Sequence, residues 1–514
     1  MSQAASITPA GEVQHRGLIS LSLMLATIMQ VLDTTIANVA LPSMTGDLGA
    51  SQDTITWVLT SYIVAAAIMT PLTGWLSDRI GRRELFLISV VGFTVTSMMC
   101  GLAWSLESMV FFRVMQGVFG AAIAPLSQTF LIDITPLEGR GSAMALWGAG
   151  IMVGPIIGPT LGGWLTETLN WRWVFFINLP VGIIAFLGCA SYLPKIAQRL
   201  RGFDFFGFAM LSLGVGALQL MLDRGESVDW FSSTEIWLEL GLAITGFWVF
   251  GVHLLTGKEP FIDPRIFKDR NFVTSLIFMF VLGIILLSGL ALMPPMLARL
   301  FNHPVITTGL VMAPRGVGTM ISMILVGRLM KVVDARILVV TGLLLTAWSL
   351  HMMTGFSPQM DDWPIITSGI VQGLGFGLVF VPLSTLAFAT LAPHFRTDGA
   401  SLSNLIRNIG SSIGISIVTV MLTRNTQINH AELAAQITPF NPALVAASPA
   451  AAQGNAAALS QIDALVNQQA LMISYVNDFK LMMIVTLCAI PLALLLRKPR
   501  IAPAAGGAPA VHMD

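Results

Sequence analysis

Gly154-Pro155-Ile156-Ile157-Gly158-Pro159-Thr160-Leu161-Gly162-Gly163 is an unusual stretch, because it lies inside a long hydrophobic run. Glycine and proline are poor helix formers in water, and within lipid they are tolerated only where neighbouring helices satisfy the backbone groups that they free. Gly154, Gly158 and Gly162 recur at every fourth residue and share one helix face, which forms a groove for a second helix. Pro155 and Pro159 are expected to bend this helix. The stretch therefore predicts a bent, tightly packed membrane-spanning helix.

The composition of the whole chain supports a membrane protein. Of its 514 residues, 55% are hydrophobic and only 11% are charged, whereas soluble domains carry about 25% charged residues. The 27 basic and 27 acidic residues leave no net charge, so we expect no nucleic-acid partner. Cys100, Cys189 and Cys488 lie in or beside hydrophobic runs without metal-ligand spacing, and no nucleophile motif or His/Asp cluster is evident. We expect neither a metal site nor an enzyme.

Hydrophobic windows of about 20 residues define the expected spans. They predict an all-α, polytopic fold of fourteen helices at residues 17–41, 54–75, 85–104, 108–132, 142–166, 173–193, 204–223, 235–256, 272–298, 306–327, 337–355, 364–391, 400–423 and 479–497. Basic residues gather in the connections after even-numbered spans, which places both termini, with tails at 1–16 and 498–514, in the cytoplasm. Residues 424–478 are expected to form a long external loop, which is either disordered or a platform for a partner.

The two halves of the chain can be aligned with each other. Gly74-Trp-Leu-Ser-Asp78-Arg79 is followed by Gln116-Gly117, and Gly327-Arg-Leu-Met-Lys-Val332 is followed at a similar distance by Gln372-Gly373. Internal six-helix repeats are typical of secondary transporters, which bind substrates between the halves. We therefore expect one bundle at 17–193, an inserted helix pair at 204–256 and a second bundle at 272–497.

Several motifs resemble those of the major facilitator superfamily. Gly74-Trp-Leu-Ser-Asp78-Arg79-Ile-Gly81-Arg82-Arg83 resembles the family's loop between helices 2 and 3, and Arg113-Val-Met-Gln116-Gly117 resembles its helix-4 motif. The Gly154–Gly163 stretch is similar to the helix-5 motif of proton-driven exporters. Residues 30–42, QVLDTTIANVALP, resemble the helix-1 motif of the fourteen-span drug:proton antiporters, and residues 218–225, LQLMLDRG, resemble their EmrB-type branch.

This resemblance implies a proton-driven exporter of hydrophobic compounds that works by alternating access in a bacterial inner membrane. It also implies a periplasmic adaptor protein and an outer-membrane channel as partners, and no cofactor besides the proton gradient. The rival readings are a proton-coupled importer on the same fold and, from other classes, a membrane receptor or a membrane-embedded enzyme. The Gly154–Gly163 stretch argues against the importer, because the resemblance associates it with exporters.

Charged residues inside the predicted spans are the first candidates for a functional site. A charge at a helix centre costs at least about 2.5–3.5 kcal/mol, so such residues face the bundle interior. We expect Asp33 to carry the proton and Arg113 to tune its protonation, the alternative being a permanent structural ion pair. Arg113 aligns with Gly369 in the second half and Asp33 aligns with Leu286–Gly289, so proton coupling is expected in the first half.

The other candidates are expected to line the substrate cavity or to lock its closed end. The cavity candidates are Gln30, Asn38, Gln116, Gln128, Met144, Trp147, Arg315 and Arg407. The two arginines are expected either to meet an anionic group or to bridge helices. In the loop between helices 2 and 3, the expected latch between the halves consists of Gly74, Asp78, Arg79, Gly81 and Arg82, and the alternative is simple membrane anchoring. The antiporter motif comprises Gly154, Pro155, Gly158, Pro159, Gly162 and Gly163.

Overall fold

The computed structural model describes residues 15–51, 54–136, 139–194, 202–438 and 440–496. Most of the two predicted tails, 1–16 and 498–514, therefore lies outside the described residues. Within the described ranges, thirteen helices are long and apolar enough to cross a membrane. The pair Trp57–Met69 and Leu72–Ile80, bent by 61°, makes a fourteenth span. The predicted all-α fold with fourteen spans is confirmed.

The first bundle contains six spans, several of which are built from two helical pieces. They are α1 (Arg16–Asp47), α2 (Trp57–Met69) with α3 (Leu72–Ile80), α4 (Arg82–Gly101), α5 (Leu106–Gly120) with α6 (Ile123–Ile134), α7 (Arg140–Ile151) with α8 (Val153–Thr168), and α9 (Trp173–Phe176) with α10 (Asn178–Tyr192). The inserted pair follows as α11 (Phe205–Arg224) and α12 (Thr234–Thr256).

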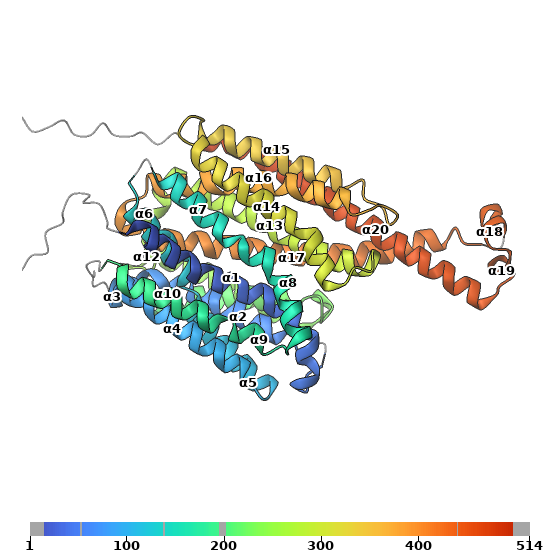
Figure 1. Cartoon of the computed structure of the whole chain (residues 1–514), viewed down its shortest axis with the longest axis horizontal. Helices are drawn as coiled ribbons and strands as arrows, with labels where there is room; N and C mark the ends of the chain where they lie inside the picture. The colour runs from blue at the N-terminus through green and yellow to red at the C-terminus, as the bar shows by residue number, and fades with distance from the viewer. Residues whose placement is uncertain (1–14, 52–53, 137–138, 195–201, 439, 497–514) are drawn as a thin grey trace, which may run out of the picture.

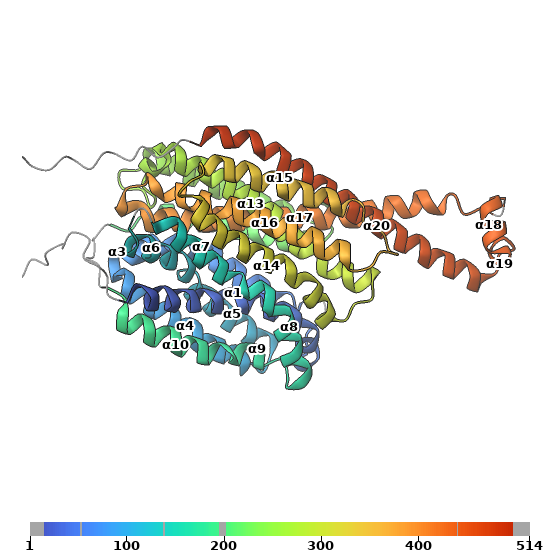
Figure 2. The same ribbon diagram turned by 45° about the horizontal axis from the view of Figure 1, so that its top comes forward.

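The second bundle has longer helices. They are α13 (Arg270–Leu300), α14 (Val305–Leu329), α15 (Ala335–Met353), α16 (Trp363–Ala389), α17 (Arg396–Ala434) and α20 (Ala456–Ala489), with the short α18 (Pro442–Ala447) and α19 (Pro449–Ala452) between the last two. Figures 1 and 2 show the blue-to-green helices of the first bundle lying beside the yellow-to-red helices of the second.

The same helix pairings occur in both bundles. In the first, α1 packs against α8, α2 against α5, and α4 against α10. The corresponding spans of the second bundle pair in the same way, as α13 with α17, α14 with α16, and α15 with α20. The sequence repeat therefore reflects a repeated helix arrangement.

The inserted pair lies at the side of the two bundles. Helix α11 packs against α12 and also contacts α2 and α17, one from each bundle. Ser412 Oγ of α17 donates to Gln219 Oε1 of α11 at 3.0 Å, and Thr60 of α2 donates to the Asp223 carboxylate. Large apolar side chains of α12, such as Trp248 at 73% exposure, point outward to the space that lipid would fill.

The predicted loop at 424–478 is largely helical. Helix α17 continues to Ala434 and α20 begins at Ala456, so both run far beyond the spans predicted at 400–423 and 479–497. Figure 1 shows them projecting from one end of the molecule, with α18 and α19 at the tip. Hydropathy windows end where polar residues begin, but the helix itself can continue, because alanine and glutamine are good helix formers in water. We call the part of residues 424–478 that projects beyond the bundles the hairpin, and the end of the bundles from which it projects the hairpin end.

Candidate functional site

A buried ion pair joins α1 to α5 in the first bundle. Arg113 Nη1 lies 2.6 Å from Asp33 Oδ2, and neither side chain is exposed. The second carboxylate oxygen, Oδ1, accepts hydrogen bonds from Gln116 Nε2 and Asn178 Nδ2, both at 2.9 Å. Arg113 Nε donates to the Val58 carbonyl at 2.9 Å. An acceptor of three hydrogen bonds has the environment of an ionised carboxylate, and the arginine compensates its charge, as burial requires.

Sequence reasoning missed Asn178 and placed Gln116 in the substrate cavity. Both side-chain amides bind Asp33 instead, and Asn178 Nδ2 also donates to Ser97 Oγ at 2.9 Å. The available signal was a lone amide between Ile177 and Leu179 in an apolar span, since polar groups inside a membrane need partners. The proton-carrier candidate therefore has a polar shell that comes from three spans.

Aromatic side chains close this shell on the arginine side. The Arg113 guanidinium carbon lies 4.4 Å from the centroid of the Tyr62 ring, a cation–π distance, while its Nη2 has no hydrogen-bond partner among the described residues. Gln30 interacts with the Tyr62 hydroxyl and is therefore beside the ion pair, outside the cavity wall.

The glycine face of α8 receives α1 beside Asp33. A Cβ atom on Gly154 would lie 3.0 Å from Val31 Cγ1, one on Gly162 would lie 3.2 Å from Ile36 Cγ2, and one on Gly158 would overlap the Thr35 hydroxyl. Only glycine permits so close an approach of the two helices. The groove thus fixes the rotation of α1, the helix that carries the buried acid.

Proline breaks the same span next to the centre of the molecule. Helix α7 ends at Ile151 and α8 starts at Val153, because Pro155 has no N–H to donate to the Ile151 carbonyl. Pro159 lies within α8. The break brings Pro155 and Ile156 into the wall of a central cavity.

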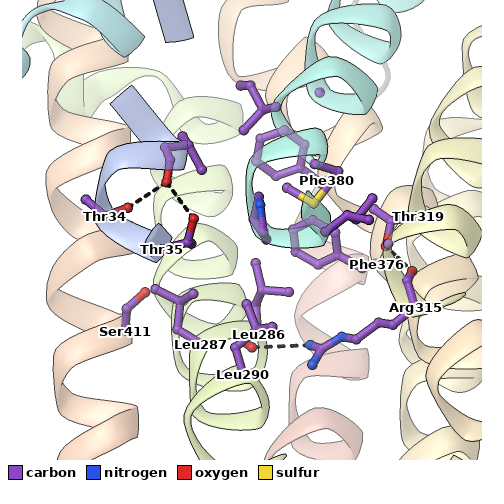
Figure 3. A pocket seen from close by; sticks show the side chains of 18 of the residues that line it. Thr34, Thr35, Leu286, Leu287, Leu290, Arg315, Thr319, Phe376, Phe380 and Ser411 are labelled. Atoms are coloured by element: carbon purple, nitrogen blue, oxygen red, sulfur yellow. Dashed lines mark hydrogen bonds between the residues drawn. The ribbon is translucent and has the colours of Figure 1, made fainter. Parts of the chain in front are cut away.

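This cavity has a volume of about 270 Å³ and lies between the two bundles. Thr34 and Thr35 of α1 line it from the first bundle, together with the region around the α7–α8 break. Figure 3 shows the opposite side, which is mainly apolar and is formed by Leu286, Leu287, Leu290, Phe376 and Phe380. A mainly apolar cavity with a few polar groups is typical of a small-molecule binding site.

Arg315 and Arg407 supply the charge in the described part of the cavity wall. Arg315 Nη2 donates to the Leu286 carbonyl at 3.3 Å, while its Nη1 has no partner among the described residues (Figure 3). Arg407 Nη2 donates to Asn404 Oδ1 at 3.0 Å. Neither guanidinium forms an ion pair with a described carboxylate, so the wall carries uncompensated positive charge.

Two glycines of the second bundle lie against Arg315. A Cβ atom on Gly289 would lie 3.4 Å from Arg315 Nη1, and one on Gly369 would lie 3.4 Å from Arg315 Cβ. Gly369 is the aligned counterpart of Arg113, and Gly289 belongs to the segment aligned with Asp33. Where the first bundle holds an acid–base pair, the second therefore holds a lone arginine.

The remaining cavity candidates lie away from this wall. Asn38 is exposed, whereas Met144 and Trp147 are 1% exposed in the hydrophobic core and leave the wall to Gly148. Gln128 Oε1 accepts a hydrogen bond from Asn404 Nδ2 at 3.1 Å and so joins α6 to α17. Residue type alone did not reveal these directions, because neighbouring residues of a helix, such as Trp147 and Gly148, face in different directions.

A second polar cluster joins the bundles at the end opposite the hairpin, which we call the latch end. Asp133 of α6 lies 2.7 Å from Arg82 of α4 and 2.5 Å from Arg396 of α17. The Asp398 carboxylate of α17 occupies the space where Gly74 of α3 would carry a side chain. These contacts connect the first bundle to the second at this end.

The predicted latch loop is only part of this cluster. Gly81 separates α3 from α4 with φ of 104°, a conformation that favours glycine, and so allows Arg82 to start a new helix. Asp78 lines a cleft at the same end, whereas Arg79 is exposed. Asp133, Arg396 and Asp398, which also join the bundles at this end, were not among the predicted residues, because their partners are distant in sequence.

Comparisons with known proteins agree with this architecture. A family model described as Major Facilitator Superfamily matches residues 23–415. The chain is 39% identical to the multidrug export protein EmrB of Haemophilus influenzae, over 83% of this chain and 84% of that protein. It is 37% identical to the fatty acid resistance protein FarB of Neisseria gonorrhoeae, over 94% and 96%. Its fold is similar to that of the proton:xylose symporter XylE, with a TM-score of 0.60 at 13% identity, covering 92% of this chain and 95% of that one.

Proposed function

The chain belongs to the major facilitator superfamily and, within it, to the family of the EmrB multidrug export proteins, and from this premise we propose that it exports hydrophobic compounds in exchange for protons. The name of one relative, a multidrug export protein, supports the direction of transport out of the cell. A bacterial inner membrane is the proposed location.

One observation carries the coupling part of the proposal. Asp33 lies in the ion pair of the first bundle, and the next two residues of the same helix, Thr34 and Thr35, line the cavity. Protonation of Asp33 removes the negative charge that holds Arg113. Any resulting movement of α1 also displaces Thr34 and Thr35 in the cavity wall. Proton binding and substrate binding thus act on one helix, which is what exchange requires.

Alternating access requires the contacts at the latch end to break and reform. The cluster of Arg82, Asp133 and Arg396 joins the two bundles at that end in this conformation. The basic connections of the sequence support a cytoplasmic position for the latch end and an external position for the hairpin end. In the proposed cycle, a proton from outside binds Asp33, and the compound enters the cavity once the latch end opens.

The cavity favours hydrophobic anions among the possible cargoes. Its apolar wall accommodates a hydrocarbon or aromatic body, and Arg315 and Arg407 lack carboxylate partners among the described residues. A carboxylate or sulfonate on the cargo would satisfy the free Arg315 Nη1. The relative named for fatty acid resistance supports this class.

The hairpin is the proposed contact for a periplasmic adaptor that leads to an outer-membrane channel. It projects beyond the bundles and exposes apolar side chains, with Phe440 at 91% and Leu465 at 60% exposure (Figure 1). Exposed apolar side chains on a projecting segment are typical of an interaction surface.

Efflux from proteoliposomes with an imposed pH gradient tests the exchange mechanism. Dansyl-undecanoate serves as a hydrophobic anion and Nile red as a neutral compound. We expect gradient-driven transport that Asp33→Asn abolishes, while the exposed Asp361→Asn leaves it unchanged. Undiminished transport by well-folded Asp33→Asn would refute the coupling role.

Replacement of hairpin residues 436–455 by a flexible linker tests the adaptor contact. Transport in proteoliposomes should persist, because the bundles remain complete, while resistance of whole cells to the same compounds should disappear. Unchanged resistance of cells would show that the hairpin is not needed for a partner.

A further inference from the structure

A further acidic side chain is buried inside a span of the second bundle, where the sequence offered no reason to expect one. Asp478 lies on α20 and is 0% exposed. Neither of its carboxylate oxygens has a hydrogen-bond partner among the described residues. This environment is the opposite of that of Asp33, whose two oxygens accept three hydrogen bonds between them.

The surroundings of Asp478 are apolar. Its neighbours along α20, Tyr475, Phe479 and Met482, belong to a hydrophobic cluster with Leu350 and Met353 of α15. The Tyr475 hydroxyl also has no hydrogen-bond partner in the described part of the chain.

No charged side chain on the helices that pack around α20 compensates Asp478. These helices are α13, α15 and α17, and their titratable or charged residues near this level are Arg299, His351 and Arg424, all of which are exposed, as is Lys480 of α20 itself. Tyr475 interacts electrostatically with both Asp478 and Arg299, but Asp478 itself takes part in no ion pair within the described ranges.

An ionised carboxylate without a partner is very unfavourable in such a place, and a buried acid avoids that cost by keeping its proton. The environments of Asp33 and Asp478 therefore favour opposite protonation states in this conformation. Asp33 is the paired carboxylate, and Asp478 is the neutral acid.

Asp478 also lies one layer behind the cavity wall. Met482, one helical turn further along α20, approaches Gly289, because a Cβ atom on Gly289 would lie 3.7 Å from Met482 Cε and 3.4 Å from Arg315 Nη1. Arg315 lines the cavity. A movement of Arg315 or Gly289 beside the cavity would therefore also displace Met482, which belongs to the apolar cluster around Asp478.

We propose that Asp478 is a second proton-binding site, located in the second bundle and occupied in the conformation described here. The site releases its proton when movement of the bundles brings water or a cation to it. This inference rests on the proposed exchange of protons, and it adds one proton to each transport cycle beyond the one carried by Asp33.

Infrared spectroscopy of the full-length purified protein tests the site without any transport measurement. A protonated carboxylic acid has a carbonyl stretching band that a carboxylate lacks. We expect this band in the wild type at neutral pH and its loss in Asp478→Asn, a variant of nearly the same shape whose melting temperature should be unchanged. Identical spectra in the carboxylic acid region would overturn the proposal.

Proton counting in proteoliposomes tests the contribution to transport, with a pH-sensitive dye inside and dansyl-undecanoate as the transported probe. The ratio of protons to probe should fall by one in Asp478→Asn and should be retained in Asp478→Glu. An unchanged ratio in a folded Asp478→Asn variant contradicts the second site. Failure of Asp33→Asn to affect transport would instead contradict the proposed exchange mechanism and leave the infrared result to decide the state of Asp478.

Discussion

Replacement of Asp33 by asparagine should destabilise the protein as well as stop exchange. The change keeps the shape of the side chain but leaves the buried Arg113 guanidinium without a counter-charge. At an effective dielectric constant near 20, two unit charges about 4 Å apart attract each other by about 4 kcal/mol. Removal of one partner of a buried pair costs about 3–5 kcal/mol in comparable cases. Both values predict a clearly lower apparent melting temperature for Asp33→Asn in detergent.

The double variant Asp33→Asn/Arg113→Gln separates stability from transport. It removes both charges, and we expect its stability to return to within about 1 kcal/mol of the wild type, because a buried pair contributes little net stability over neutral groups. Gradient-driven efflux should stay absent, since the proton carrier is gone. A single variant as stable as the wild type, or a double variant that regains transport, would refute this account of the pair.

The remaining predictions concern the helix groove, the latch and the cavity. Gly158→Val should push α8 away from α1 and cost about 1–3 kcal/mol of stability through overpacking. We expect a lower melting temperature and slower efflux, and wild-type values of both would contradict the tight contact between the two helices. Asp133→Arg and Arg396→Asp should each weaken export, and the double variant that carries both changes should recover part of it. We expect a coupling energy of about 0.5–3 kcal/mol between the two sites. Strictly additive losses of export would argue against the ion pair between Asp133 and Arg396. Arg315→Gln should raise the KM for dansyl-undecanoate about tenfold, the value expected for loss of one charge-assisted hydrogen bond, and leave Nile red transport unchanged; equal effects on both compounds would exclude charge recognition.

Much of the architecture can be predicted from this sequence, because hydrophobic length and repeated motifs depend on local composition. The pairing of Asp33 with Arg113 can be predicted as well, because an unpaired charge inside a membrane span is unfavourable and opposite charges in one bundle compensate each other. The direction in which a polar side chain points cannot be read in this way. Gln116 belongs to the shell of Asp33 and Asn38 is exposed, although both occur in apolar spans.

Residues at the ends of spans were the hardest to predict. Asp478 lies one residue before the predicted span 479–497 and close to Lys480, so it resembled part of a polar loop. In the structure, α20 extends from Ala456 to Ala489, so Asp478 lies well inside the helix and its side chain is buried. Asp133 and Arg396 likewise occur near the ends of helices, and only tertiary contact brings them together.

The positive wall of the cavity has an electrical consequence for the cell. In the proposed exchange, and counting only the proton that Asp33 carries, the export of a monovalent anion and the entry of a proton together transfer two positive charges inward across the membrane. A potential of 100 mV, negative inside, contributes about 2.3 kcal/mol per charge, or about 4.6 kcal/mol for this pair, whereas a neutral cargo gains half as much and a monovalent cation gains nothing. If the cargo is the anion that we propose for Arg315 and Arg407, export should be strongest at high membrane voltage and should continue when the pH difference has collapsed.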